Sequence, residues 1–222
     1  MTELGKIEKP EVSSFKEERK LYLVPLLFPA REPPAFKKQE EERSVEEKEE
    51  VKFYSQYGER FNKYWDEAWS QINNLESKLG EINKIYYEQV LDKGEQGARV
   101  IEGINEKSYQ IVKGKLGKGA KLEAIEKGQI LSELADCEKC LLMGLRSQKI
   151  RKFIAKSYEK AAKERKKYIA ARIDKTLGDG EAGILFIREG HQVQFSSNIQ
   201  VFYIAPPALD ELQRWLREQT VR

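Results

Sequence analysis

Residues 183–187 read Gly-Ile-Leu-Phe-Ile, a continuous apolar run of the kind that forms a buried strand. The longest uninterrupted helical pattern of the chain, residues 147–177, comes shortly before it. Two strand candidates and a last helix follow it, at 193–195, at 199–204 and from Pro206 onward. This half of the chain therefore alternates between helix and strand, as α/β proteins do.

The same alternation runs through the residues before 147. A long amphipathic helix is predicted over residues 51–79, where aromatic and aliphatic residues recur every three or four positions. Shorter elements follow, with strands at 82–87 and 120–125 and helices at 98–104, 108–116 and 128–145. We therefore expect a single α/β domain, in which a mixed β-sheet is flanked by the long amphipathic helices 51–79 and 147–177.

The first 36 residues differ from the rest of the chain. Charged residues without periodicity fill much of positions 1–19, apolar residues cluster between Leu21 and Phe28, and prolines follow soon after. We predict a mobile N-terminal arm with a short strand over residues 1–36, and an α/β domain over residues 37–222.

The composition excludes several classes of protein. Of the 222 residues 35% are charged, and no apolar run approaches the ~20 residues that a membrane-spanning helix needs. No targeting segment is visible, which favours a cytoplasmic protein without a membrane partner. The single histidine, His191, excludes sites built from several histidines, and Cys137 and Cys140 form a C-x-x-C pair with too few further ligands for zinc. We expect neither a metal nor another cofactor, and the sequence indicates no oligomeric state.

Positive charge is concentrated on one predicted helix. The whole chain carries a net charge of only +3, but residues 146–175 hold twelve bases and three acids. At 100° per residue, six of these bases fall within an arc of about 80°. They are Lys149, Lys152, Lys156, Lys160, Lys163 and Lys167. Such a stripe neutralises the phosphates of a nucleic acid, docks an acidic protein, or is only a solvated helix face.

Two arginines of the same helix, Arg165 and Arg172, are predicted to point toward the core. Because a guanidinium keeps its proton in a protein, a buried one needs a carboxylate, a carbonyl or an anionic ligand beside it. The acids available in or just beyond the predicted strands are Glu88, Glu123 and Glu126. The two arginines therefore belong either to structural ion pairs or to an anion site.

His191 follows the 183–187 strand, in the segment Arg188-Glu189-Gly190-His191. Open α/β sheets bind ligands beyond the carboxyl ends of their strands, and this is such a position. Glu189 and His191 would act there as acid and base or as two metal ligands. The alternative is a hydrogen-bonded histidine in a surface turn.

A segment of about forty residues resembles a known family. The helix around Arg165, the 183–187 strand and His191 look like the closing segment of TraB/PrgY-like and erythromycin-esterase-like proteins. The resemblance implies that Arg165 and His191 line the site. It also implies that Glu88 lies at the position where the family has a motif early in its sequence. The first strand of that family ends in Gly-x-x-His, whereas residues 86–88 here read Tyr-Tyr-Glu, which also fits a non-catalytic relative.

Two hypotheses of function follow. The first is a non-enzymatic cytoplasmic binding protein that uses the six stripe lysines and Arg172 on nucleic acid or on an acidic partner. The second is a hydrolase-like enzyme with a pocket formed by Arg165, Glu189 and His191. We favour the binding protein, because the chain has one histidine and no complete catalytic motif.

Overall fold

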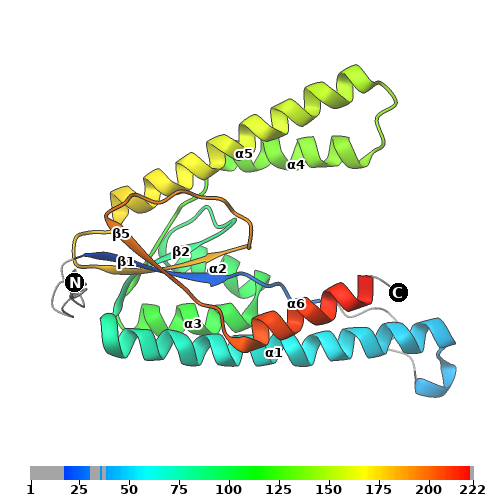
Figure 1. Ribbon diagram of the computed structural model, residues 1–222, viewed down its shortest axis with the longest axis horizontal. Helices are drawn as coiled ribbons and strands as arrows, with labels where there is room; N and C mark the ends of the chain where they lie inside the picture. The colour runs from blue at the N-terminus through cyan, green and yellow to red at the C-terminus, as the bar shows by residue number, and fades with distance from the viewer. Residues whose placement is uncertain (1–17, 31–35, 37–38, 221–222) are drawn as a thin grey trace, which may run out of the picture.

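Helices cover both faces of a β-sheet in the computed structural model, which describes residues 18–30, 36 and 39–220 (Figure 1). The strands are β1 Arg19–Pro25, β2 Ile82–Tyr87, β3 Lys121–Glu123, β4 Ala182–Ile187 and β5 Ile199–Tyr203. The helices are α1 Val45–Leu79, α2 Gly94–Ile104, α3 Glu106–Gly117, α4 Gly128–Leu142, α5 Gln148–Thr176 and α6 Pro207–Thr220. The predicted α/β class is confirmed.

The described strands all run in the same direction, in the order β3-β2-β4-β1-β5. The prediction of a mixed sheet is therefore wrong, because every connection returns the chain to the same end of the sheet before the next strand begins. Three of these connections contain helices, and residues 188–198 make the fourth without one. β4, which holds the 183–187 run, is central and entirely buried. A Cβ on its Gly183 would lie 2.9 Å from the ring of Tyr86, so only glycine fits there.

β1 is a central strand and does not belong to an arm. It lies between β4 and β5, and all of its residues are buried. In the two registers Leu21 lies opposite Gly183 and Val201. The predicted boundary at residue 36 therefore separates β1 from the sheet that it completes. The part of the predicted arm before residue 18 lies outside the described residues.

α1 covers one face of the sheet with its aromatic side chains. Tyr64 and Trp65 are almost fully buried, and the Tyr64 hydroxyl donates to the carbonyl oxygen of Pro25 at 2.5 Å. Residues of α2, α3 and α6 belong to the same core cluster. α1 begins several residues earlier than predicted, because Ser44 and Glu47 form a capping box within the charged segment.

α4 and α5 form a helical hairpin on the opposite face, and Figure 1 shows it projecting away from the sheet. The C-terminal part of α5 packs on the sheet through Ile169 and Ile173. Its N-terminal part packs against α4, around Ile130, Leu134 and Ala161. In the part of the chain that the structure describes, no helix is long and apolar enough to cross a membrane.

The strand predicted over residues 193–195 does not form. These residues lie in the connection between β4 and β5, where Gln192 has a φ of 53° and the Val193 N–H donates to His191 Nδ1 at 2.9 Å. A backbone amide that is bonded to a side chain is not available to a neighbouring strand. The apolar side chain of Val193 is instead buried in the core cluster beneath α5.

Candidate functional site

The candidate site is a pocket of about 650 Å³ at the carboxyl ends of β2 and β4, which we call the β2/β4 pocket. After β2 the chain passes to α2, which packs with α1. After β4 it crosses the α5 face instead, where Lys166 Nζ donates to Gln192 at 3.0 Å. The chain thus leaves two adjacent strands toward opposite faces of the sheet, which opens a crevice between the ends of these strands. Open α/β sheets bind their ligands in such crevices. The predicted position of a site after the 183–187 strand coincides with this pocket.

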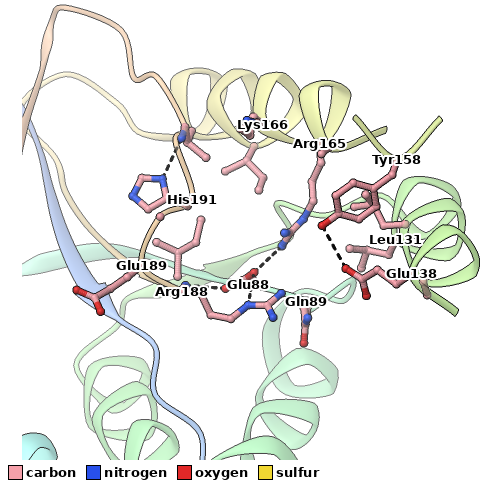
Figure 2. Close-up of a pocket in the computed structure, with 17 residues that line it drawn as sticks. Glu88, Gln89, Leu131, Glu138, Tyr158, Arg165, Lys166, Arg188, Glu189 and His191 are labelled. Atoms are coloured by element: carbon pink, nitrogen blue, oxygen red, sulfur yellow. Dashed lines mark hydrogen bonds and ion pairs between the residues drawn. The ribbon is translucent and has the colours of Figure 1, made fainter. Parts of the chain in front are cut away.

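Two buried carboxylates meet at Arg165, which reaches down from α5 toward Glu88 in Figure 2. Glu88 directly follows β2, and Glu126 lies a few residues beyond β3. Arg165 donates from Nη2 to Glu88 Oε1 at 2.9 Å and from Nε to Glu126 Oε2 at 3.0 Å. Of the three kinds of partner expected for an inward-pointing arginine, a carboxylate, a carbonyl or an anionic ligand, Arg165 contacts carboxylates. The third available acid, Glu123, pairs with Lys93.

Arg188 supplies a second positive charge to the same carboxylate. It follows β4, and it donates its backbone N–H to Glu88 Oε2 at 2.7 Å and its Nε to Glu88 Oε1 at 3.1 Å. Burial lowers the pKa of the Arg165 guanidinium, but the hydrogen bonds and charges of Glu126 and Glu88 outweigh it and raise that pKa above its usual value. Two guanidinium cations therefore balance two buried carboxylates.

Sequence reasoning missed Arg188 and Gln89 as parts of this network. The position of Arg188, directly after an apolar strand, could have identified it by the same argument as Glu88. Gln89 has a φ of 66°, which is uncommon for a residue with a side chain, and its N–H donates to Glu126 Oε1 at 3.1 Å. Gln192 is the other non-glycine residue with positive φ in the described chain, so both strained positions adjoin the pocket.

His191 lines the pocket, with its ring fixed by the backbone. Nδ1 accepts the N–H of Val193 at 2.9 Å, so the neutral ring carries its proton on Nε2. Burial lowers the pKa of His191, and the negative charge of Glu88 only partly opposes this. The neutral imidazole is therefore the favoured form at pH 7, and its Nε2–H is a hydrogen-bond donor.

Glu189 does not point into the pocket with Arg165 and His191, as the enzyme hypothesis predicts. It lines the rim of the pocket, but Figure 2 shows its carboxylate turned away from Arg165 and His191. It accepts hydrogen bonds from the Tyr203 hydroxyl at 2.8 Å and from Gln213. Arg165, Glu189 and His191 line one pocket but form no hydrogen-bonded group of three. The carboxylate that Arg165 contacts at the pocket is that of Glu88.

The six stripe lysines form the second candidate surface, which we call the lysine face of α5. All six are exposed, and none forms an ion pair with a described residue. Phe153 lies beside them on the helix and is 67% exposed. Arg172 does not belong to this face, because it points to the other side of α5 and donates to the Ala124 carbonyl oxygen at 3.1 Å.

No family model, curated protein or solved structure matches this chain. The resemblance to TraB/PrgY-like and erythromycin-esterase-like proteins therefore stays a prediction. Among the described residues, no cluster of three or more histidine, cysteine, aspartate or glutamate side chains is arranged to hold a metal ion. Cys137 and Cys140 are free, half-buried thiols on α4.

Proposed function

We propose that the protein binds nucleic acid through the lysine face of α5. One observation carries this proposal: six exposed lysines follow one line of a helix, without an anionic partner among the described residues. Unpaired lysines at this density repel one another, and the phosphates of a polyanion relieve the repulsion while they release their own counterions.

The spacing of the lysines suits a nucleic acid backbone. From Lys149 to Lys167 the face extends ~27 Å at 1.5 Å per residue. A duplex carries a phosphate about every 3.4 Å along each strand, so every lysine of the face has phosphates within reach. The hairpin projects from the sheet (Figure 1), and the six lysines are exposed, so a long, straight partner can lie along this face.

An exposed aromatic residue favours nucleic acid over an acidic protein. Phe153 is 67% exposed beside the lysines, and an aromatic ring next to a basic surface is the arrangement that stacks on unpaired bases. An acidic protein surface would satisfy the lysines but would leave this ring without a function.

The test is fluorescence anisotropy with a labelled 20-nucleotide single strand and a 20-base-pair duplex. Six phosphate contacts predict an affinity for the duplex that falls about a thousandfold between 50 and 200 mM salt. Replacing Lys152, Lys156 and Lys163 by Gln should weaken binding at 50 mM salt at least tenfold, and should reduce the slope of log K against log salt by about three.

A second triple variant provides the matched control. Lys78, Lys118 and Lys121 are exposed and lie away from α5, so replacing them by Gln changes the net charge equally. This control should bind nearly as well as the unmodified protein. Equal losses in the two triple variants, or no binding of either nucleic acid at 50 mM salt, would contradict the proposal.

A further inference from the structure

The β2/β4 pocket has hydrogen-bond donors without partners among the described residues. Both oxygens of Glu88 are already bonded to the two arginines. Arg165 makes its hydrogen bonds through Nε and Nη2, and the side chain of Arg188 makes its own through Nε. Nη1 of Arg165, both Nη groups of Arg188 and Nε2 of His191 therefore stay available. A ligand that binds these donors must supply hydrogen-bond acceptors.

These donors are held in place before any ligand arrives. Arg165 is fixed between two buried carboxylates, and its side chain is only 17% exposed. His191 is held through Nδ1 by the Val193 amide. Binding to groups that are already ordered avoids most of the entropy cost of immobilising long side chains.

The rest of the wall is partly apolar and partly polar, and on the hairpin side it includes Glu138 and Tyr158, whose hydroxyl donates to Glu138 at 3.3 Å. Leu131, Leu134 and Ala135 of α4 line the side of the pocket toward the hairpin. Ile169 and Ile187 line it nearer the sheet, and both are almost fully buried. The pocket thus presents hydrogen-bond donors at the strand ends and an apolar patch on α4, and its volume of about 650 Å³ is in the usual range for small-molecule sites.

We propose that the β2/β4 pocket binds a small organic anion. Its carboxylate or phosphate accepts hydrogen bonds from Arg165, Arg188 and His191, and its apolar body lies against α4. This binding function goes beyond the proposed nucleic acid binding and does not depend on it.

Salt dependence separates this site from the lysine face. The two arginines already neutralise Glu88 and Glu126, so the anion is held by directed hydrogen bonds and by burial more than by a strong positive field. We expect its affinity to fall less than about tenfold between 50 and 200 mM salt, because only one or two ionic contacts form.

The first experiment uses calorimetry and the NMR signal of the Cε1 proton of His191, which is unambiguous because the chain has one histidine. The probes are 4-phenylbutyrate and phenyl phosphate, each with an anionic group on an apolar body. The controls are 4-phenylbutanol, which lacks the charge, and inorganic phosphate and acetate, which lack the body. At least one anionic probe should shift the signal and bind at least tenfold more tightly than its controls. Equal binding of the alcohol, or no shift with either probe, would overturn the proposal.

The second experiment closes the pocket without removing a charge. Ala135 is an exposed residue of the pocket wall, so Ala135→Trp fills the pocket while the protein stays folded. This variant should lose at least tenfold in affinity for the probe that binds. Ser132→Trp, on an exposed position of α4 outside the pocket, should not. Unchanged affinity in Ala135→Trp would refute the assignment.

The third experiment removes one donor group. Arg188 is half-exposed, and Arg188→Gln should weaken binding of the anionic probe at least tenfold. Arg217→Gln is the matched control, because Arg217 is an exposed arginine on α6, on the other face of the sheet. Equal affinities of the two variants would show that the anionic group does not bind at the strand ends.

Discussion

Arg165 joins three segments that are far apart in the sequence, because it links α5 to the residues after β2 and β3. Removing this guanidinium leaves the buried Glu126 carboxylate without a cation, and leaves Glu88 with Arg188 alone. We predict that Arg165→Met lowers the free energy of unfolding by about 3–5 kcal/mol in urea denaturation. Lys166→Met, at the neighbouring position, should have little effect, because its partner Gln192 is exposed. Equal stability of the two variants would contradict a structural role for Arg165.

His191 should titrate below the usual histidine pKa of 6.5, because burial disfavours its charged form. Between the folded and unfolded pKa values the unfolded chain binds more protons, so the contribution of His191 to stability is present above pH 6.5 and is lost as the pH falls through the folded pKa. The NMR midpoint of its Cε1 proton measures this pKa directly. Urea denaturation at pH 7 and pH 5 should show a smaller loss of stability for His191→Gln than for the unmodified protein. A midpoint at or above 6.5 would show that the ring is not desolvated.

The sequence predicts that Arg165 points inward, because helix periodicity specifies the direction of a side chain, and it offers Glu88, Glu123 and Glu126 as available acids without deciding among them. It did not indicate that Glu189 turns away. That orientation depends on the turn after β4, where Gly190 and Gln192 both have positive φ. Apolar periodicity carries no information about such backbone conformations.

At the scale of elements, a buried ion pair joins α1 to α3. Lys115 and Glu76 contact each other with 3% and 7% of their side chains exposed, and Lys115 also donates to Asn73 at 3.1 Å. Lys115→Met should lower the free energy of unfolding by about 3–5 kcal/mol, because it leaves the Glu76 carboxylate buried without a cation. Adding Glu76→Gln should recover part of this loss.

An exposed pair on α1 serves as the control for this prediction. Lys63 and Glu211 also form an ion pair, between α1 and α6, but each side chain is about half exposed. Lys63→Met should therefore leave the stability nearly unchanged, because solvent screens such pairs. If Lys63→Met lowered the free energy of unfolding as much as Lys115→Met, burial would not determine how much stability is lost when an ion pair is broken.

The helices were predictable in kind and position, since each has an apolar face that repeats at the helical period. What covers that face was not predictable. The apolar residues of α5 indicate burial along its length, but Ile169 and Ile173 meet the sheet, whereas Ala161 meets α4. Periodicity shows which side of a helix is covered and does not identify the neighbour.

At the scale of the whole molecule, the place of β1 in the sheet predicts one cooperative unit. Val24 is fully buried in β1, and a carboxylate there has no partner. Val24→Asp should therefore abolish the folded state, as measured by circular dichroism and by thermal unfolding. Val201→Asp, on the edge strand β5 and 44% exposed in the unmodified protein, should leave the protein folded. An unchanged unfolding transition in Val24→Asp would support the alternative of an arm attached to an independent domain.

The fold class was predictable because strand and helix patterns alternate along the chain. The strand order was not, because β1 pairs with residues 182–187 and 199–203, which lie near the other end of the sequence. Short-range patterns carry no information on such long-range pairings. The apolar run from Leu21 to Phe28 therefore predicts a short strand but does not place it in the sheet.

The central place of β1 has a consequence for the order of events during synthesis. β1 lies between β4 and β5 in the sheet, and both of these strands are made more than 150 residues after it. Until then its apolar residues have no sheet to join, and closing so long a loop makes this pairing slow. The nascent chain therefore holds an unpaired apolar strand while residues 26–181 are made, and such an exposed strand is prone to aggregation.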